Sequence, residues 1–255
     1  MSGTYLYAIV KSAAKPPTAG APAGLPGAER RVSLKAADAL WLIASEVPLD
    51  VYGPESLERH LGDLDWVGRI ALAHEAVVEY FARRRGAAVI PMKLFTMFSS
   101  PQRAVDEIAK RKRAIGAAMR RIAGAEEWGV RVTRAEAPHP PTHSARPSSG
   151  AAFLAAKKQA RDDQRVAKAA AADAAAGVFD ALAKVARESR RREHPPAGGA
   201  TPPLLDAAFL VAAGRRASFT RAAGHEAARC ARAGAHLTLS GPWPAYNFVQ
   251  GTERA

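Results

Sequence analysis

The chain contains 255 residues, 48% of them hydrophobic, which is enough for one or two domains with a substantial core. Its 37 lysines and arginines against 24 acidic residues give a net charge of +13, which suits nucleic acid or an acidic surface but also arises from genome-wide composition bias. The single cysteine, Cys230, excludes an intrachain disulfide and a cysteine-based zinc finger. No stretch reaches the roughly 18 apolar residues of a membrane span, so we expect a soluble, cytoplasmic protein.

The first part of the chain is organised around residues 64–98. Apolar side chains recur there at steps of three and four, which predicts an amphipathic helix that ends before Gly86, and the apolar run 89–98 predicts a buried strand. Further strands are predicted at 4–10, 31–34, 39–45 and 128–133, although 41–45 also fits the start of a helix. Helices are predicted at 54–61 and at 101–123, the latter capped by Ser100.

A proline-rich segment divides the chain. Residues 138–149 predict a linker between an N-terminal domain, 1–137, and a C-terminal domain, 150–255. The order of strands and helices in both domains predicts the α+β class, with helices packed on a mostly antiparallel sheet.

The C-terminal domain begins with an alanine-rich segment. Residues 150–192 predict a long helix, which either runs straight or folds back near Gly177. Strands are predicted at 204–212 and 236–239, with a helix at 218–233 between them. Prolines on both sides of Trp243 hold the backbone extended there.

Eight segments, in this order, resemble the gas vesicle protein GvpF/GvpL family. They are YLYAIV (5–10), ASEVP (44–48), LDWVGRIALAHE (64–75), PMKLFTMF (91–98), EEWGVRV (126–132), GAAFLAAKK (150–158), LLDAAFLVA (204–212) and LSGPWPAYNFV (239–249). The chain departs from the family pattern at Phe95, where the family strand has glycine, and at Ala245, where the aromatic motif has a second proline.

The resemblance implies two α+β domains, each with a ferredoxin-like or modified ferredoxin-like core. It also implies an accessory or minor structural component of the gas vesicle that takes part in nucleation or assembly of the shell. The expected partners are the small hydrophobic shell protein and other accessory proteins. The family is not known for catalysis, so we expect no enzyme activity, no cofactor and no small-molecule substrate.

Histidines and the cysteine provide the candidates for chemistry. His74 falls within the apolar stripe of the helix, and we interpret it as a hydrogen-bonded core residue. His139 and His143 have a metal-like spacing, but a proline-rich linker is a poor cage, so we expect no metal site. Cys230 is interpreted as a buried structural thiol. No catalytic residue is predicted.

Partner contacts are predicted at four aromatic residues: Trp66, Trp243, Tyr246 and Phe248. The alternative for the C-terminal aromatics is packing in the core or between domains. The runner-up function is a basic nucleic-acid-binding adaptor carried by the +13 charge. Against it stands the lack of any recognisable binding module or of aromatics interleaved with the cations.

Overall fold

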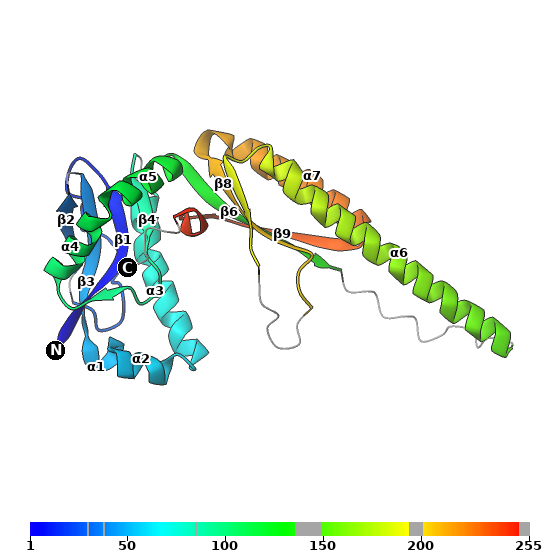
Figure 1. The fold of residues 1–255 in the computed structure, drawn as a ribbon, viewed down its shortest axis with the longest axis horizontal. Coiled ribbons are helices and arrows are strands. Elements are labelled where there is room, and N and C mark those ends of the chain that lie inside the picture. Colours follow the sequence, from blue (N-terminus) through cyan, green and yellow to red (C-terminus); the bar gives the residue numbers. More distant parts are fainter. Residues whose placement is uncertain (30, 38, 85, 136–148, 194–200, 250–255) are drawn as a thin grey trace. The chain divides into compact units, whose positions relative to one another are not determined.

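The structure is a computed structural model that describes residues 1–29, 31–37, 39–84, 86–135, 149–193 and 201–249 (Figure 1). The chain forms two compact units: unit 1 comprises Met1–Glu127 and Pro242–Ala255, and unit 2 comprises Trp128–Gly241. The end of the chain therefore groups with its beginning. Almost all of the predicted linker lies outside the described residues, so the predicted domain boundaries stay a prediction.

Unit 1 contains a five-stranded sheet in the order β2-β3-β1-β4, with β5 also paired to β1. Its strands are β1 (Ser2–Lys11), β2 (Val32–Ala37), β3 (Leu40–Pro48), β4 (Ala88–Pro91) and β5 (Met97–Phe98). All these pairings are antiparallel, with Tyr5 opposite Ser45 and Val10 opposite Trp41. The predicted strand over 89–98 is thus two strands, because residues 92–96 leave the sheet.

The helices of unit 1 are α1 (Leu49–Tyr52), α2 (Pro54–His60), α3 (Leu64–Ala82), α4 (Pro101–Lys110) and α5 (Lys112–Ile122). Two of them begin where predicted, α2 at Pro54 and α4 after the Ser100 cap. The Asp63 carboxylate accepts hydrogen bonds from the first turn of α3, and the Ser100 hydroxyl accepts one from the first turn of α4. The predicted helix 101–123 is interrupted at Arg111, whose φ of −101° and ψ of 10° are not helical.

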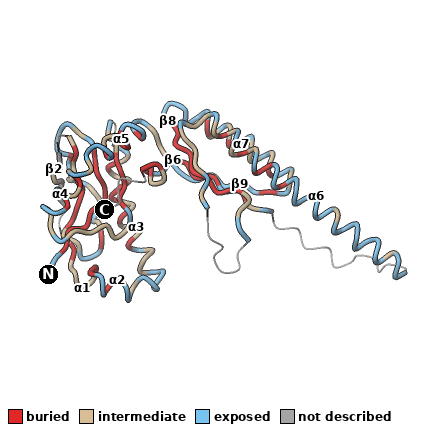
Figure 2. The backbone as a smooth tube through the Cα atoms, viewed as in Figure 1, coloured by how far each residue is buried: buried red, intermediate tan, exposed pale blue. Residues whose placement is uncertain are grey.

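Strand β1 forms the centre of unit 1. Its eight inner residues are all buried, which requires cover on both faces because successive side chains point to opposite sides (Figure 2). On one face, Tyr5 and Tyr7 pack with α3 through Ile70, Val77 and Phe81. Helices α4 and α5 contribute buried residues that are not part of the cluster around Tyr5 and Tyr7. They are Ala104, Ile108, Ile115, Met119 and Ile122.

Unit 2 contains a four-stranded sheet in the order β7-β8-β6-β9 and two helices. The strands are β6 (Ala125–Arg134), which begins in unit 1, β7 (Glu188–Arg191), β8 (Leu205–Ala212) and β9 (Ala235–Trp243), which ends in unit 1. The helices are α6 (Gly150–Ala183) and α7 (Arg216–Arg232), and a 3-10 turn, η1 (Ala213–Arg215), precedes α7. A second 3-10 turn, η2 (Tyr246–Phe248), belongs to unit 1.

Helix α6 runs straight through Gly177, so of the two predicted courses the straight one is found, although the helix ends at Ala183 rather than Arg192. A Cβ atom on Gly177 would lie 2.5 Å from Nη2 of Arg229 on α7. The same Nη2 donates a hydrogen bond of 3.0 Å to the Ala174 carbonyl oxygen. Gly177 therefore makes room for a contact between the two helices instead of breaking one of them.

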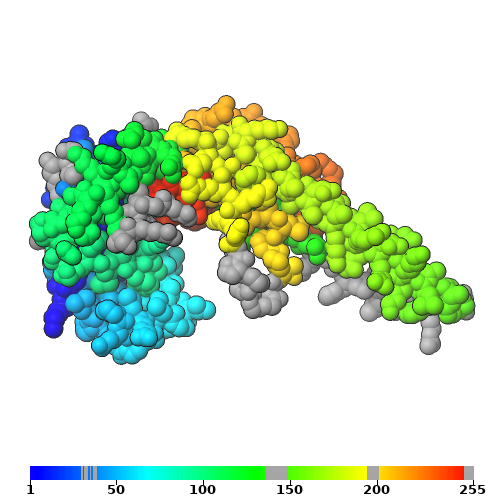
Figure 3. All heavy atoms as spheres, viewed as in Figure 1, coloured from blue at the N-terminus to red at the C-terminus, as the bar shows by residue number. Residues whose placement is uncertain are grey.

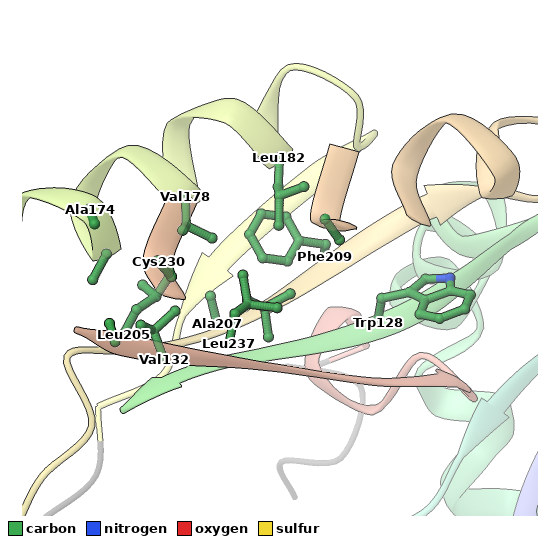
Figure 4. Packing of buried hydrophobic residues seen from close by; sticks show 14 of the residues in the cluster. Trp128, Val132, Ala174, Val178, Leu182, Leu205, Ala207, Phe209, Cys230 and Leu237 are labelled. Carbon is green, nitrogen blue, oxygen red and sulfur yellow. The ribbon is translucent and has the colours of Figure 1, made fainter. Parts of the chain in front are cut away.

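The core of unit 2 lies between these helices and the sheet (Figure 4). Val178 and Leu182 of α6 point toward Phe209 on β8, and Cys230 of α7 lies within the same cluster. The Cys230 thiol is buried, as predicted, and burial raises its pKa.

A buried carboxylate joins three segments at the sheet of unit 2. Asp206 on β8, with only 1% of its side chain exposed, accepts hydrogen bonds from Arg131 on β6 and from Arg192 just after β7. The two arginines balance a charge that would otherwise be costly to bury.

Candidate functional site

An aromatic stack lies on unit 1 where α2 meets α3. Trp66, in the first turn of α3, is stacked between His60 at the end of α2 and Phe95 in the loop between β4 and β5. The ring centroids are 5.0 Å from Trp66 to His60 and 5.8 Å from Trp66 to Phe95. Trp66 is half-buried, so part of this predicted contact residue faces solvent.

The backbone of Phe95 is in the left-handed region, with φ +65°. Among the described residues it is the only non-glycine residue with positive φ. The Phe95 N–H donates a hydrogen bond of 3.2 Å to the hydroxyl of buried Tyr5, which anchors the loop on the core. A glycine would adopt this conformation without strain, which gives a physical reason for the glycine of the family pattern at this position.

Three leucines on α3 and in the turn before it are exposed. Leu61 follows α2, and Leu64 and Leu72 lie on α3 at a spacing of eight residues, with Gly68 between them on the same side of the helix. Their exposed fractions are 52% for Leu61, 82% for Leu64 and 74% for Leu72. We call Leu61, Leu64 and Leu72 the leucine surface; Trp66 lies on the side of α3 opposite Leu64 and packs against the core. The leucines were not predicted, because they lie outside the stripe that packs on the core.

His74 is a core residue, as predicted. It is buried, and its Nδ1 shares a 2.8 Å hydrogen bond with the hydroxyl of Tyr5. Burial lowers the pKa of His74 to about 4, against a smaller opposing effect of the Met92 backbone, so the ring is neutral near pH 7.

No group of three or more histidine, cysteine or acidic side chains within the described residues is placed to hold a metal ion. His139 and His143 lie outside those residues. None of the described helices combines the length and apolar character that crossing a membrane requires.

The C-terminal aromatics are held on unit 1 by polar contacts. The Tyr246 hydroxyl donates a hydrogen bond to the Glu75 carboxylate of α3, and the backbone N–H of Asn247 donates one of 2.8 Å to Glu127. Phe248 is fully buried, and its carbonyl oxygen accepts a hydrogen bond of 3.2 Å from Arg121. Trp243, in contrast, is 44% exposed. The four predicted contact residues therefore differ: Trp66 and Trp243 offer surface, whereas Tyr246 and Phe248 fasten the segment.

Glu75 and Glu127, which accept these hydrogen bonds, were not predicted as contact residues. Burial raises the pKa of Glu75, and the hydrogen bond from Tyr246 partly offsets that rise. Burial also raises the pKa of Tyr246, and the adjacent carboxylate raises it further, so its hydroxyl keeps its proton and acts as a donor.

A cavity of about 330 Å³ lies on unit 1 beside the end of α3. The described residues that line it are mostly apolar or small: Val10, Ser12, Pro16, Pro17, Phe81, Arg84, Gly86 and Ala87. Arg84, the one charged member of this lining, is turned toward Tyr80, with which it makes a hydrogen bond and a cation–π contact. This lining supplies no pair of groups for acid–base or nucleophilic chemistry.

Comparison with known protein families identifies the family to which this chain belongs. Residues 3–250 match the family described as gas vesicle synthesis protein GvpL/GvpF. The chain belongs to this family. The predicted resemblance is thereby confirmed, and the chain is a gas vesicle protein.

Solved structures of GvpF proteins have the same fold. The gas vesicle protein GvpF from Anabaena sp. PCC7120 aligns with a TM-score of 0.65 at 17% identity, over 98% of this chain and 97% of that one. GvpF from Microcystis aeruginosa aligns with a TM-score of 0.64 at 14% identity, over 97% of this chain and 99% of that one. No curated protein sequence matches the chain. The predicted α+β class, with an antiparallel sheet in each part and a long helix in the second, is confirmed.

Proposed function

We propose that this GvpL/GvpF protein takes part in nucleation or assembly of the gas vesicle shell by binding the shell protein and other accessory proteins, and that it does so without catalysis. The observation that carries the proposal is the leucine surface on unit 1. Several large apolar side chains left exposed on one short stretch of chain mark a candidate surface for binding another protein. A shell subunit is hydrophobic, so it needs a partner that covers apolar surface before it is incorporated.

The four predicted contact residues divide into two roles in this proposal. Trp66 and Trp243 contact the partner, because part of each ring is exposed. Phe248 and Tyr246 act indirectly by fixing the segment that presents Trp243, since one is buried and the other is bonded to Glu75. A half-buried tryptophan fixed by stacking loses little conformational entropy on binding, which favours it as an anchor.

The test is capture of purified shell protein by the full-length protein, at low and at high salt. The double variant L64D/L72D places two charges on the leucine surface at exposed positions, so it is expected to fold. We expect it to capture shell protein at least about tenfold less well, because two side chains that the partner would cover are replaced by charges. Apolar recognition by the unmodified protein should persist at high salt, because salt screens only the electrostatic part.

The matched control is A114D/A117D, which places the same two charges on exposed positions of α5. It should capture shell protein like the unmodified chain. The proposal fails if the unmodified protein captures none at either salt concentration, or if L64D/L72D captures as well as the control. A parallel assay with duplex DNA tests the runner-up function, which predicts binding that falls steeply with salt.

A further inference from the structure

The first half of helix α6 lies outside the core of unit 2. The helix has 34 residues and is therefore about 51 Å long. Its second half packs on α7 and β8 through Ala171, Ala174, Ala175, Val178 and Leu182. In residues 150–170 no side chain is buried, and only Ala152 and Asp162 are as much as half-buried (Figure 2). The packed half supplies the helix nucleus on which the free half depends.

Charge is distributed unevenly around this free half. Residues 150–170 contain five cations and two carboxylates, a net charge of +3. At 100° per residue, all five cations lie on one side of the helix together with Phe153 and Leu154. We call this the basic face; its members are Phe153, Leu154, Lys157, Lys158, Arg161, Arg165 and Lys168. Asp162, Asp163 and Val166 lie on the other sides.

The carboxylates do not neutralise the basic face. Asp162 lies 3.8 Å from Arg165, and Asp163 accepts a hydrogen bond from Gln159. Within the described residues, Lys157, Lys158 and Arg161 form no ion pair. Figure 3 shows the spheres of this half of α6 standing clear of the other described residues in that view. The exposed apolar side chains are also substantial, at 52% for Phe153 and 67% for Leu154.

We propose that the basic face of α6 docks an acidic amphipathic helix of a partner protein. The cations repeat at the spacing at which a second helix presents carboxylates along its own side, and Phe153 and Leu154 give the contact an apolar end. A second copy of this chain would bring the same five cations into opposition, which is repulsive. Nucleic acid would use the cations but not the two exposed apolar side chains, and a bilayer would need more large apolar residues than this face offers.

This surface is separate from the leucine surface and belongs to the other unit, so the two proposals are tested independently. The probe is a synthetic acidic amphipathic helical peptide with one leucine-containing side, and the comparison peptide has the same composition in scrambled order. Binding to the full-length protein is measured by fluorescence anisotropy. We expect the amphipathic peptide to bind at least about tenfold more tightly than the scrambled one, because only the first aligns its carboxylates and leucines.

The decisive variant is K157E/R161E/K168E, which reverses charge at three exposed positions of the basic face. It should weaken peptide binding at least about tenfold while shell-protein capture through the leucine surface is retained. The control R103E/R113E/R120E makes the same change in net charge at exposed positions of α4 and α5 and should bind the peptide like the unmodified chain. Circular dichroism checks that both variants keep their helix content.

Three results would overturn the proposal. Equal binding of the two peptides would show that only composition matters. Equal weakening by both triple variants would show that only net charge matters. Tighter binding to duplex DNA or to anionic vesicles, or self-association that K157E/R161E/K168E abolishes, would assign the basic face to a different occupant.

Discussion

Phe95 stacks on Trp66 with the two ring planes within 7° of each other and their centroids 5.8 Å apart. The backbone of Phe95 holds a φ of +65° in this position. Left-handed backbone costs a residue with a side chain about 1–2 kcal/mol, which glycine does not incur. The loop thus combines a backbone conformation suited to glycine with an aromatic contact that glycine lacks.

Two substitutions at this position separate the backbone cost from the stacking. Phe95→Ala and Phe95→Gly both remove the ring, but only glycine relieves the left-handed backbone. We expect Phe95→Gly to be more stable than Phe95→Ala by about 1 kcal/mol in the free energy of unfolding by urea. If the alanine variant were as stable as the glycine variant, position 95 would not be left-handed in solution.

The same loop shows where prediction from sequence reached its limit. Residues 89–98 are almost wholly apolar, and the local marks of the break, Pro91 and Lys93, do not fix where residues 92–96 leave the sheet. The break is instead held by a long-range contact, the hydrogen bond from Phe95 N–H to the Tyr5 hydroxyl. Strand β7 was missed for a related reason: its sequence, ESRR, has no strand character, and its pairing with β8 makes it a strand.

Elements with strong local signals were predicted well. The cap at Ser100, the apolar stripe of α3 and the core position of His74 all follow from spacing, and the structure contains each of them. The candidate site was harder to predict, because exposure is a tertiary property. Spacing separates Leu64 and Leu72 from the core stripe, but it does not say whether a neighbouring element covers them.

The contact between Tyr246 and Glu75 should contribute measurably to stability. Tyr246→Phe removes the hydroxyl and leaves a carboxylate that is largely buried without its donor. We expect a loss of about 1–3 kcal/mol in the free energy of unfolding by urea, at about pH 7. The comparison variant is Tyr80→Phe on α3, whose hydroxyl donates an exposed hydrogen bond to the Ala19 carbonyl oxygen and accepts one from Arg84, and it should cost about 1 kcal/mol.

The cost of Tyr246→Phe should depend on pH. Burial raises the pKa of Glu75 in the folded protein, so the folded state binds a proton more readily than the unfolded state does. This group therefore favours folding at low pH, and the advantage is lost as pH rises through its raised pKa. The tyrosine bond matters most when Glu75 is ionised, so the stability difference between variant and unmodified protein should shrink as pH falls through the raised pKa of Glu75. A constant or growing difference would contradict this assignment.

His74 should change the pH dependence of the free energy of unfolding in the direction opposite to Glu75. Its pKa is lowered from 6.5 to about 4 by burial, so the unfolded chain takes up the proton first as pH falls. Stability from the neutral ring is complete above about pH 6.5 and is lost between about pH 6.5 and pH 4, by roughly 3 kcal/mol in all. His74→Gln removes the titrating group and should flatten that part of the curve of unfolding free energy against pH. An unchanged slope would mean that His74 is accessible to protons in the folded state.

Asp206 of unit 2 should be more sensitive to substitution than either of its arginine partners. The Asp206 carboxylate is buried, while Arg131 keeps about half and Arg192 about a third of its side chain in solvent. Arg131→Ala leaves Arg192 paired with Asp206 and should cost less than about 1 kcal/mol after allowance for screening. Asp206→Asn removes the charge that both arginines share and should cost about 2 kcal/mol.

Hydrogen exchange of the amides in β6 and β8 measures this difference locally, because those strands carry Arg131 and Asp206. The matched surface control is Asp162→Asn on α6, whose 3.8 Å pair with Arg165 is half-exposed and should change exchange by less than about 0.5 kcal/mol. If Arg131→Ala were as damaging as Asp206→Asn, the two arginines would act together rather than in parallel. The stability of the sheet would then depend on the pair of cations as much as on the buried carboxylate between them.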